Sequence, residues 1–412
     1  MSFIHRTIKY IFVFYIATLI TSCAYLQKVE RAFEYAKDDE KEKIPTIVAI
    51  PSKNPVEVRA AMLLPRSGKY SDIGKNIFDA AQLAIYELKA GDIKIEPIDI
   101  GSDKESAANA LENFDASKID ILLGPIFSEQ IPIVYDFAKK NSLITLSYSN
   151  DITFAHNTGL YLLGIMPEQQ AVKIASYAGK IDFNNIYMIV ANDKFGDAIE
   201  EALITNSAPL KYTVRKVQKY INVQQSKPLQ GLELSQAALD IKYAINHDIK
   251  NYIPGFGRPA VLIPEGGTKL KKVVQQLSLI QDASKRDYKL LGIGNWEDYN
   301  LRPYSAYEGA LVADIPNDIL HQFENRFFEY YQYKPLRISS LAYDSVTLLA
   351  AIMNTTDSSI IIEFDKLQRS NGYKGVTGVF RLMPDGTNER KFSIYEMKLG
   401  MLKEIVSASN SF

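Results

Sequence analysis

The sequence predicts an α/β protein of two lobes, each a doubly wound parallel sheet with helices on both of its faces. Short apolar runs alternate with stretches of helical periodicity from residue 56 onward, and the series starts again near Ile186. Strands that alternate with helices favour right-handed crossovers and a parallel sheet. The length of 412 residues agrees, because it exceeds the usual size of one hydrophobic core and suits two domains of roughly 150 to 200 residues.

The first half is expected to contain strands at residues 58–64, 93–100, 119–123 and 143–147. The first of these is a nearly continuous apolar run, which is typical of a buried parallel strand. A helix should follow it, with Ser71 or Asp72 as N-cap and apolar residues at helical spacing up to Leu88. Helix-compatible stretches at 103–117 and 128–140 separate the later strands.

The second half repeats this pattern, with strands expected at residues 186–190, 211–220, 260–264 and 289–294. Helices are expected from Asp197, near 234–246 and from Thr268. Ligands of open parallel sheets bind at the carboxyl ends of the strands. A functional site is therefore expected in the loops that follow Leu64, Leu123, Leu146, Val190, Ile263 and Ile293.

Several kinds of chemistry lack the residues that they need. His156, His247 and His321 are the histidines beyond the N-terminal segment, and none has a partner at metal-ligand spacing. Neither a G-x-S-x-G elbow nor a G-x-x-x-x-G-K-[ST] phosphate loop occurs, and Gly68 and Gly74 are spaced too widely for a dinucleotide fingerprint. The sequence predicts no metal, no cofactor and no enzyme of a standard motif class. An enzyme whose residues meet only in space stays a third alternative.

Charge and cysteine content argue against two further features. Lys and Arg total 47 against 48 Asp and Glu, and no basic stripe stands out, so nucleic acid is not an expected partner. The chain has 1 cysteine, which excludes an intramolecular disulfide. Stability must therefore come from packing.

The N-terminus has the parts of an export signal. Arg6 and Lys9 precede an apolar stretch at 10–20, and Thr21 and Ser22 stand before the single cysteine, Cys23. The apolar stretch is shorter than the roughly 20 residues of a membrane-spanning helix, so retention as an anchor is the weaker interpretation. Residues 1–22 are predicted to be a signal peptide and Cys23 a lipid-attachment site. The alternative is a chance cysteine in an ordinary cleaved signal.

The quartet Ile20-Thr21-Ser22-Cys23 resembles the lipobox of bacterial lipoproteins, which implies acylation of Cys23 and cleavage before it. Ala24 at the next position resembles outer-membrane sorting, so the expected location is the periplasmic face of the outer membrane. Residues 23–55 are rich in charge and contain an unbroken charged run at 37–43, which predicts a solvated tether.

From residue 56 to about 400 the chain resembles the type 1 periplasmic binding proteins, the family of the leucine/isoleucine/valine-binding proteins. The resemblance rests on the order of five short segments, at residues 63–74, 123–128, 147–149, 193–196 and 375–386. It implies lobe one at 56–165 plus 304–370, lobe two at 166–303 plus 371–412, and a hinge of three crossings. It also implies a ligand in the cleft, its carboxylate held by a serine hydroxyl and backbone N–H groups and its ammonium by an acid.

Within that family, the lipobox and the stretch Gly292-Ile293-Gly294-Asn295-Trp296 are similar to the penicillin-binding protein activator lipoproteins. This resemblance implies a regulator of peptidoglycan synthesis that docks on a penicillin-binding protein. Large members carry a helical-repeat domain where this chain has its short tether. The alternative is an ABC-transporter-type solute receptor for an amino acid or small peptide.

The resemblance also selects candidate ligand-binding residues. Glu265 is the expected acid, and the serines after strands are expected on the carboxylate side. Three candidates have a structural alternative: Ser147 and Ser149 suit turn capping, and Trp296 suits ordinary packing. The full candidate set is Ser67, Gly68, Tyr70, Ser128, Ser147, Ser149, Glu265, Asn295 and Trp296.

Overall fold

The computed structural model describes residues 57–155, 159–221, 227–250, 257–278, 288–294, 296, 305–353 and 367–412. The predicted signal peptide, Cys23, the tether and Asn295 lie outside these described residues. The described residues all belong to one compact unit, Ala49–Phe412. Among them, no helix combines the length and the apolar character that a membrane span requires.

The first lobe is built on a five-stranded parallel sheet with the order β2-β1-β3-β4-β5. Its central part is fully buried: all residues of β1 except Arg59 are shielded from solvent. The strands are β1 (Val58–Leu64), β2 (Ile93–Asp99), β3 (Ile121–Leu123), β4 (Ile144–Ser147) and β5 (Leu160–Leu162).

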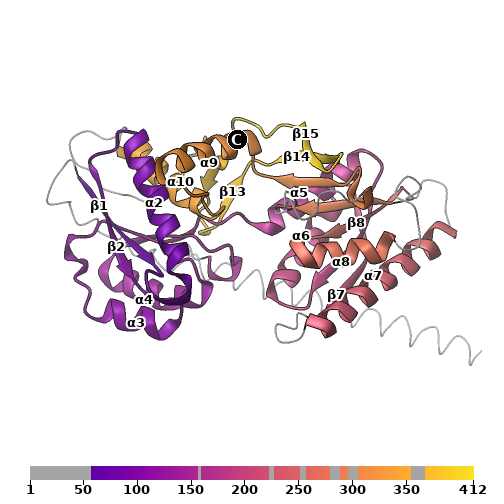
Figure 1. Cartoon of the computed structure of the whole chain (residues 1–412), viewed down its shortest axis with the longest axis horizontal. Coiled ribbons are helices and arrows are strands. Elements are labelled where there is room, and N and C mark those ends of the chain that lie inside the picture. The colour runs from indigo at the N-terminus through magenta and orange to yellow at the C-terminus, as the bar shows by residue number, and fades with distance from the viewer. Residues whose placement is uncertain are drawn as a thin grey trace, which may run out of the picture. The chain divides into compact units, whose positions relative to one another are not determined.

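Helices cover both faces of this sheet because side chains alternate along each strand. Met62 and Leu64 of β1 pack with α2, α9 and α10, whereas Ala61 and Leu63 pack with α3 and α4. Figure 1 shows the orange α10 beside the indigo α2, although the two helices are far apart in sequence. The helices are α2 (Ser71–Glu87), α3 (Lys104–Glu112), α4 (Ile131–Asn141), α9 (Asn317–Tyr331) and α10 (Ser339–Met353).

The second lobe is built on a seven-stranded sheet with the order β15-β14-β10-β9-β8-β6-β7. Strands β7, β6, β8, β9 and β10 run parallel, and β14 and β15 add an antiparallel hairpin at one edge. The strands are β6 (Asn185–Ala191), β7 (Thr213–Tyr220), β8 (Pro259–Ile263), β9 (Lys289–Ile293), β10 (Leu311–Asp314), β14 (Ser393–Lys398) and β15 (Met401–Val406).

Two helices cover each face of the second sheet as well. Helices α5 and α6 pack on the face that carries Ile186 and Met188 of β6, and α7 and α8 pack on the face of Tyr187 and Ile189. The alternation of β6 thus divides its side chains between two cores. The helices are α5 (Pro167–Lys180), α6 (Lys194–Ser207), α7 (Lys227–Lys250) and α8 (Gly267–Ser278).

A small antiparallel sheet of β11 (Tyr373–Gly375), β12 (Gly378–Leu382) and β13 (Asn388–Arg390) completes the first lobe. Its Tyr373, Phe380 and Leu382 belong to the same core as α2 and α10. The chain therefore passes between the lobes three times: between β5 and α5, between β10 and α9, and between β13 and β14. The predicted architecture of two parallel-sheet lobes with three crossings is confirmed.

The first crossing, expected between residues 165 and 166, lies between β5 and α5, but the second and third lie at other positions than the sequence suggested. Strand β10 pairs with β9 in the second sheet, although residues 304–370 were expected in the first lobe. The sheet β11–β13 packs in the first lobe, although residues 371–412 were expected in the second. These strands have at most five residues each, and their composition does not reveal which sheet supplies their partner. The helix after β1 also differs: Tyr70 is the N-cap, because a 3₁₀ turn at Gly68–Tyr70 leads directly into α2.

Candidate functional site

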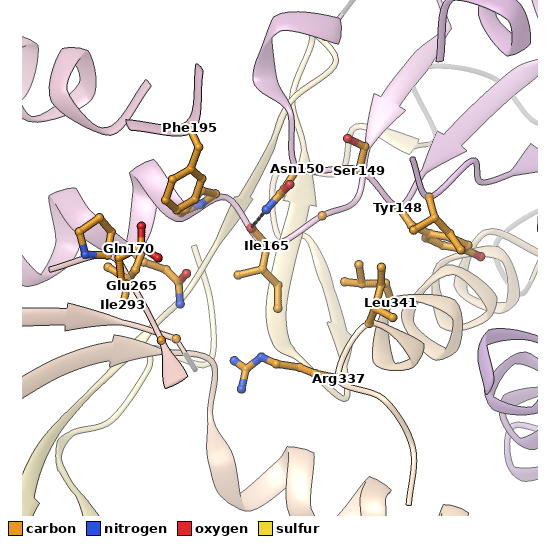
Figure 2. A pocket seen from close by; sticks show the side chains of 17 residues that line it. Tyr148, Ser149, Asn150, Ile165, Gln170, Phe195, Glu265, Ile293, Arg337 and Leu341 are labelled. Carbon is orange, nitrogen blue, oxygen red and sulfur yellow. Dashed lines mark hydrogen bonds between the residues drawn. The ribbon is translucent and has the colours of Figure 1, made fainter. Parts of the chain in front are cut away.

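A cavity of about 370 Å³ lies where residues from both lobes meet. Its walls come from the segments after β4, β8 and β9, from the first crossing, and from the start of α10, as Figure 2 shows. This is the carboxyl edge of both sheets, where ligands of parallel α/β folds bind. The lining consists of Ile126, Tyr148, Ser149, Asn150, Gly164, Ile165, Pro167, Gln170, Phe195, Pro264, Glu265, Gly266, Ile293, Gly294, Arg337, Ile338 and Leu341.

The wall combines branched aliphatic side chains, such as Ile126 and Leu341, with the uncharged polar side chains of Ser149, Asn150 and Gln170. Two charged side chains interrupt it, Glu265 from the second lobe and Arg337 from the first. A volume of this size suits a small organic ligand, and a few fixed polar groups on apolar walls are typical of such sites. The cavity is therefore equipped for a small molecule with both apolar and charged parts.

Glu265 follows β8 and is held by two neighbours. The Tyr220 hydroxyl donates a hydrogen bond to Oε1, and the Lys269 ammonium lies 3.6 Å from Oε2. Burial raises the pKa of the Glu265 carboxyl, while Tyr220 and Lys269 act in the opposite direction. The side chain keeps 11% of its surface exposed, so one part of the carboxyl remains accessible from the cavity. Such a group attracts an ammonium when it is ionised.

The two serines after β4 have different surroundings. Ser147 is completely buried, and its hydroxyl donates to the Pro125 carbonyl at 3.0 Å and accepts from the Ser149 N–H at 3.2 Å. Ser149 lines the cavity, and its Oγ accepts from the Asp151 N–H at 3.1 Å. Ser147 thus shapes the turn, whereas the Ser149 hydroxyl hydrogen stays available to a ligand.

Arg337 is a cavity residue that the sequence did not suggest. It precedes α10, and its Nη2 donates to Oδ1 of Asp314, the last residue of β10. Oδ1 also accepts from the Ile315 N–H at 2.8 Å and from Nε2 of Gln170 at 3.2 Å. Arg337 stands between α9 and α10 and does not follow a strand, so the pattern of strand ends in the sequence did not indicate it.

The other candidates do not line the cavity. The Ser67 hydroxyl bonds to Asp99, Tyr70 packs on Phe127 with ring centroids 5.2 Å apart, and Ser128 begins a 3₁₀ turn. Gly68 has a φ of +69°, which the turn before α2 requires. As sites for a ligand these residues stay predictions.

Trp296 packs inside the second lobe. It is 1% exposed, its ring lies edge-on to Tyr307 at 6.0 Å, and its Nε1 donates to the Glu265 carbonyl at 3.0 Å. A Cβ on Gly292 would stand 2.3 Å from this ring, so Gly292 and Trp296 pack directly against each other. Trp296 supports the backbone of Glu265 from behind.

No group of three metal-ligating side chains occurs among the described residues.

Comparisons with known proteins agree with this geometry. Residues 57–220 match a family described as periplasmic binding protein. An uncharacterized protein of Rickettsia prowazekii (strain Madrid E) is 26% identical over 171 residues, which cover 40% of this chain. The chain spans only 45% of the length of that relative.

Solved structures resemble most of the described chain. A structure from Rhodospirillum rubrum, assigned to a branched-chain amino acid ABC transporter, has a TM-score of 0.68 at 15% identity and covers 85% of this chain and 100% of its own. A branched-chain amino acid ABC transporter ligand-binding protein of Burkholderia xenovorans LB400 has a TM-score of 0.64 at 16% identity, covering 85% and 95%. LivJ of Streptococcus pneumoniae, in complex with isoleucine, reaches 0.57 at 17% identity, covering 86% and 100%.

Proposed function

We propose that this chain, which has the type 1 periplasmic binding protein fold, is an extracytoplasmic receptor for a small zwitterionic solute, most simply an amino acid with an apolar side chain. The observation that carries the proposal is the cavity itself. It places a carboxylate, Glu265, and a guanidinium, Arg337, on walls that also carry aliphatic and uncharged polar side chains. Structures of similar fold include one with bound isoleucine, which supports this class of ligand.

The roles of the two lobes follow from the chemistry of an amino acid. Glu265, supported by Tyr220 and Lys269, receives the ammonium, and the aliphatic residues Ile126, Ile165 and Leu341 surround the side chain. Burying the ligand's side chain, if it is as large as that of valine or leucine, contributes roughly 1.5 to 3 kcal/mol to the binding free energy. Ser149 offers its hydroxyl to the carboxylate side.

A thermal-shift screen with the 20 common L-amino acids tests this function. A ligand at 100 times its dissociation constant adds about 2.7 kcal/mol to the stability of the folded state, which shifts the unfolding midpoint by several degrees. The wild-type protein is expected to respond to at least one amino acid, and Glu265→Gln to lose that response. Glu105→Gln, an exposed substitution on α3, is the matched control. The proposal fails if the wild type responds to none of them.

The predicted lipid anchor at Cys23 would hold the receptor at the periplasmic face of a membrane. Its support is the sequence around Cys23. Detergent phase partitioning of the full chain should place the wild type in the detergent phase and Cys23→Ala in the aqueous phase. Equal partitioning of the wild type and Cys23→Ala would contradict the predicted lipid anchor.

The regulator that docks on a penicillin-binding protein stays the second candidate, supported by the lipobox and the stretch from Gly292 to Trp296. In the structure, Gly292 and Trp296 pack against each other inside the second lobe, which gives this motif an internal role. Affinity capture with purified penicillin-binding proteins tests the docking. A stable complex, combined with silence in the amino-acid screen, would favour the regulator over the receptor.

A further inference from the structure

We propose that Arg337 binds the carboxylate of the ligand and so makes the receptor selective for solutes with a free carboxylate. The inference rests on the proposed function, because both place the ligand in the same cavity. It replaces the serine-centred carboxylate site that the family resemblance implied with a site centred on a guanidinium.

The guanidinium of Arg337 has donors to spare. Its Nη2 donates to Asp314, and within the part of the chain that the structure describes, Nε and Nη1 make no hydrogen bond. The side chain is 29% exposed and lines the cavity. Figure 2 shows it reaching from the side of Leu341 toward Gln170, below Ile165. A planar fork with free N–H groups matches the geometry of a carboxylate.

Asp314 holds the guanidinium in place and leaves some of its N–H donors free. The Asp314 carboxylate is 2% exposed and is already satisfied in part by the Ile315 N–H and by Nε2 of Gln170. Its bond to Nη2 therefore holds one corner of the guanidinium in place. Nε and Nη1 lie on different edges of the guanidinium, and the edge that Asp314 does not occupy remains for an incoming anion. A donor that is held in position before binding loses less entropy when it binds.

The serine side of the cavity offers only uncharged donors. The Ser149 N–H is bonded to Ser147 Oγ at 3.2 Å, the Tyr148 N–H to the Pro125 carbonyl at 3.0 Å, and the Gly164 N–H to the Ser149 carbonyl at 3.2 Å. The donors that remain on this segment are the Ser149 hydroxyl and the N–H groups of Asn150, all of them neutral. Hydrogen bonds between two ionised groups are roughly twice as strong as neutral ones, so Arg337 dominates the binding of an anion.

The charges also define the ligand as a whole. Glu265 and Arg337 come from different lobes, and the rest of the wall includes aliphatic side chains from both lobes. A ligand with one ammonium, one carboxylate and an apolar body satisfies both charges. A carboxamide of the same shape leaves Arg337 without an anion in a partly desolvated site, and such an unpaired group weakens binding.

The test is isothermal titration calorimetry of the full chain with L-leucine and L-leucinamide, or with the amino acid that stabilises the wild type most and its carboxamide. The wild type is expected to bind the amino acid about 10- to 100-fold more tightly than the carboxamide, as hydrogen bonds to charged groups imply. Arg337→Gln should lose that factor for the amino acid and keep its affinity for the carboxamide within about 2-fold. Arg369→Gln, an exposed arginine, is the matched control.

A third probe separates the two charges. 4-Methylpentanoate, which is leucine without its ammonium, should bind Glu265→Gln at least as well as it binds the wild type and should lose affinity in Arg337→Gln. The unfolding midpoint of each variant without ligand shows whether it is folded.

Two results would overturn the inference: Arg337→Gln binds the amino acid as tightly as the wild type does, or Ser149→Ala alone removes the preference for the free carboxylate. Either leaves the proposed receptor intact. A wild type that binds no amino acid at all would instead remove the proposed function, and this inference with it.

Discussion

Two arginine–aspartate pairs lie beside the crossings between the lobes, and their surroundings differ. Arg390 of β13 pairs with Asp344 of α10 at 3.4 Å, and neither side chain has any exposed surface. Arg337 pairs with Asp314, but 29% of the Arg337 side chain is exposed in the cavity. The same two residue types thus meet once inside the protein and once at its candidate binding site.

The buried pair is almost saturated with partners. Asp344 accepts from the Val376 N–H at 2.7 Å and from the Thr377 hydroxyl, and Arg390 Nη2 donates to the Leu163 carbonyl at the first crossing. The guanidinium also lies 4.8 Å from the centre of the Phe380 ring. Only its Nε lacks a hydrogen bond among the described residues. This pair ties α10, the small sheet and the first crossing into one block.

The two arginines differ in how many of their hydrogen-bond donors are satisfied inside the protein, and this difference distinguishes a structural arginine from a candidate ligand-binding one. A buried ion pair is stable only when its remaining donors and acceptors are satisfied inside the protein. Arg390 meets this condition at Nη1 and Nη2 but not at Nε, whereas two nitrogens of Arg337, Nε and Nη1, make no hydrogen bond within the described residues. The first pair joins α10, the small sheet and the first crossing, whereas Arg337 of the second pair lines the cavity.

Asp344→Ala gives the largest expected effect, because it leaves Arg390 charged, buried and without its counterion. A loss of about 3 to 5 kcal/mol in the free energy of unfolding is expected. Denaturant titration measures it, with Asp136→Ala on the exposed face of α4 as control. A loss below about 1 kcal/mol would mean that the buried pair is dispensable and the comparison is wrong.

The pH dependence of binding sharpens the role of Glu265. Burial raises the pKa of this carboxyl above its ordinary 4.5. As pH falls through the raised pKa, Glu265 becomes neutral and no longer attracts an ammonium. Affinity for the amino acid should then drop by up to tenfold per pH unit, since one proton is taken up. Calorimetry at pH 7, 6, 5 and 4 measures it.

In Glu265→Gln, the remaining affinity should change little over the same pH range. The stability of the ligand-free protein should depend on pH in the opposite direction to ligand affinity. Because the pKa is raised in the folded state, the contribution of Glu265 is fully present below pH 4.5 and is lost as pH rises through the raised pKa. A wild-type affinity that is independent of pH would assign the ammonium to another group.

Asp314→Asn breaks the ion pair with Arg337 and should lower the free energy of unfolding less than Asp344→Ala, which breaks the ion pair with Arg390. The amide oxygen still accepts from Ile315 and Gln170, so unfolding should become easier by only about 1 kcal/mol. Arg337 loses its fixed corner, and amino-acid affinity should fall several-fold while binding remains measurable. A destabilisation as large as that of Asp344→Ala would show that both pairs are structural.

Ser149→Ala is expected to have the smallest effect. It removes one neutral hydroxyl from the cavity wall, and a single neutral hydrogen bond contributes about 0.5 to 1.5 kcal/mol. The affinity for an amino acid should fall by less than about tenfold, clearly less than in Arg337→Gln. Calorimetry of the two variants side by side provides the ranking, and a reversed order would return the carboxylate to the serine.

The sequence predicted the parallel sheets well because β1, β6 and β8 are dense apolar runs with helical stretches between them. It also placed Glu265 and Ser149 correctly beyond strand ends, since strand ends follow from the same pattern. It did not predict Arg337. This residue lies beside Asp314 because the chain, after running along α9, comes back to the end of β10 before α10 begins. Nor did the sequence assign β10 to its sheet, because pairing depends on partners distant in sequence.

The central claim is that the ligand lies between the charges of Glu265 and Arg337. The most direct test is calorimetric titration of the stabilising amino acid into the wild type, each single variant and the double variant Glu265→Gln/Arg337→Gln. Each single variant should bind more weakly than the wild type, and the double variant should give no measurable heat of binding while remaining folded. A double variant that binds the amino acid with wild-type affinity would contradict the claim.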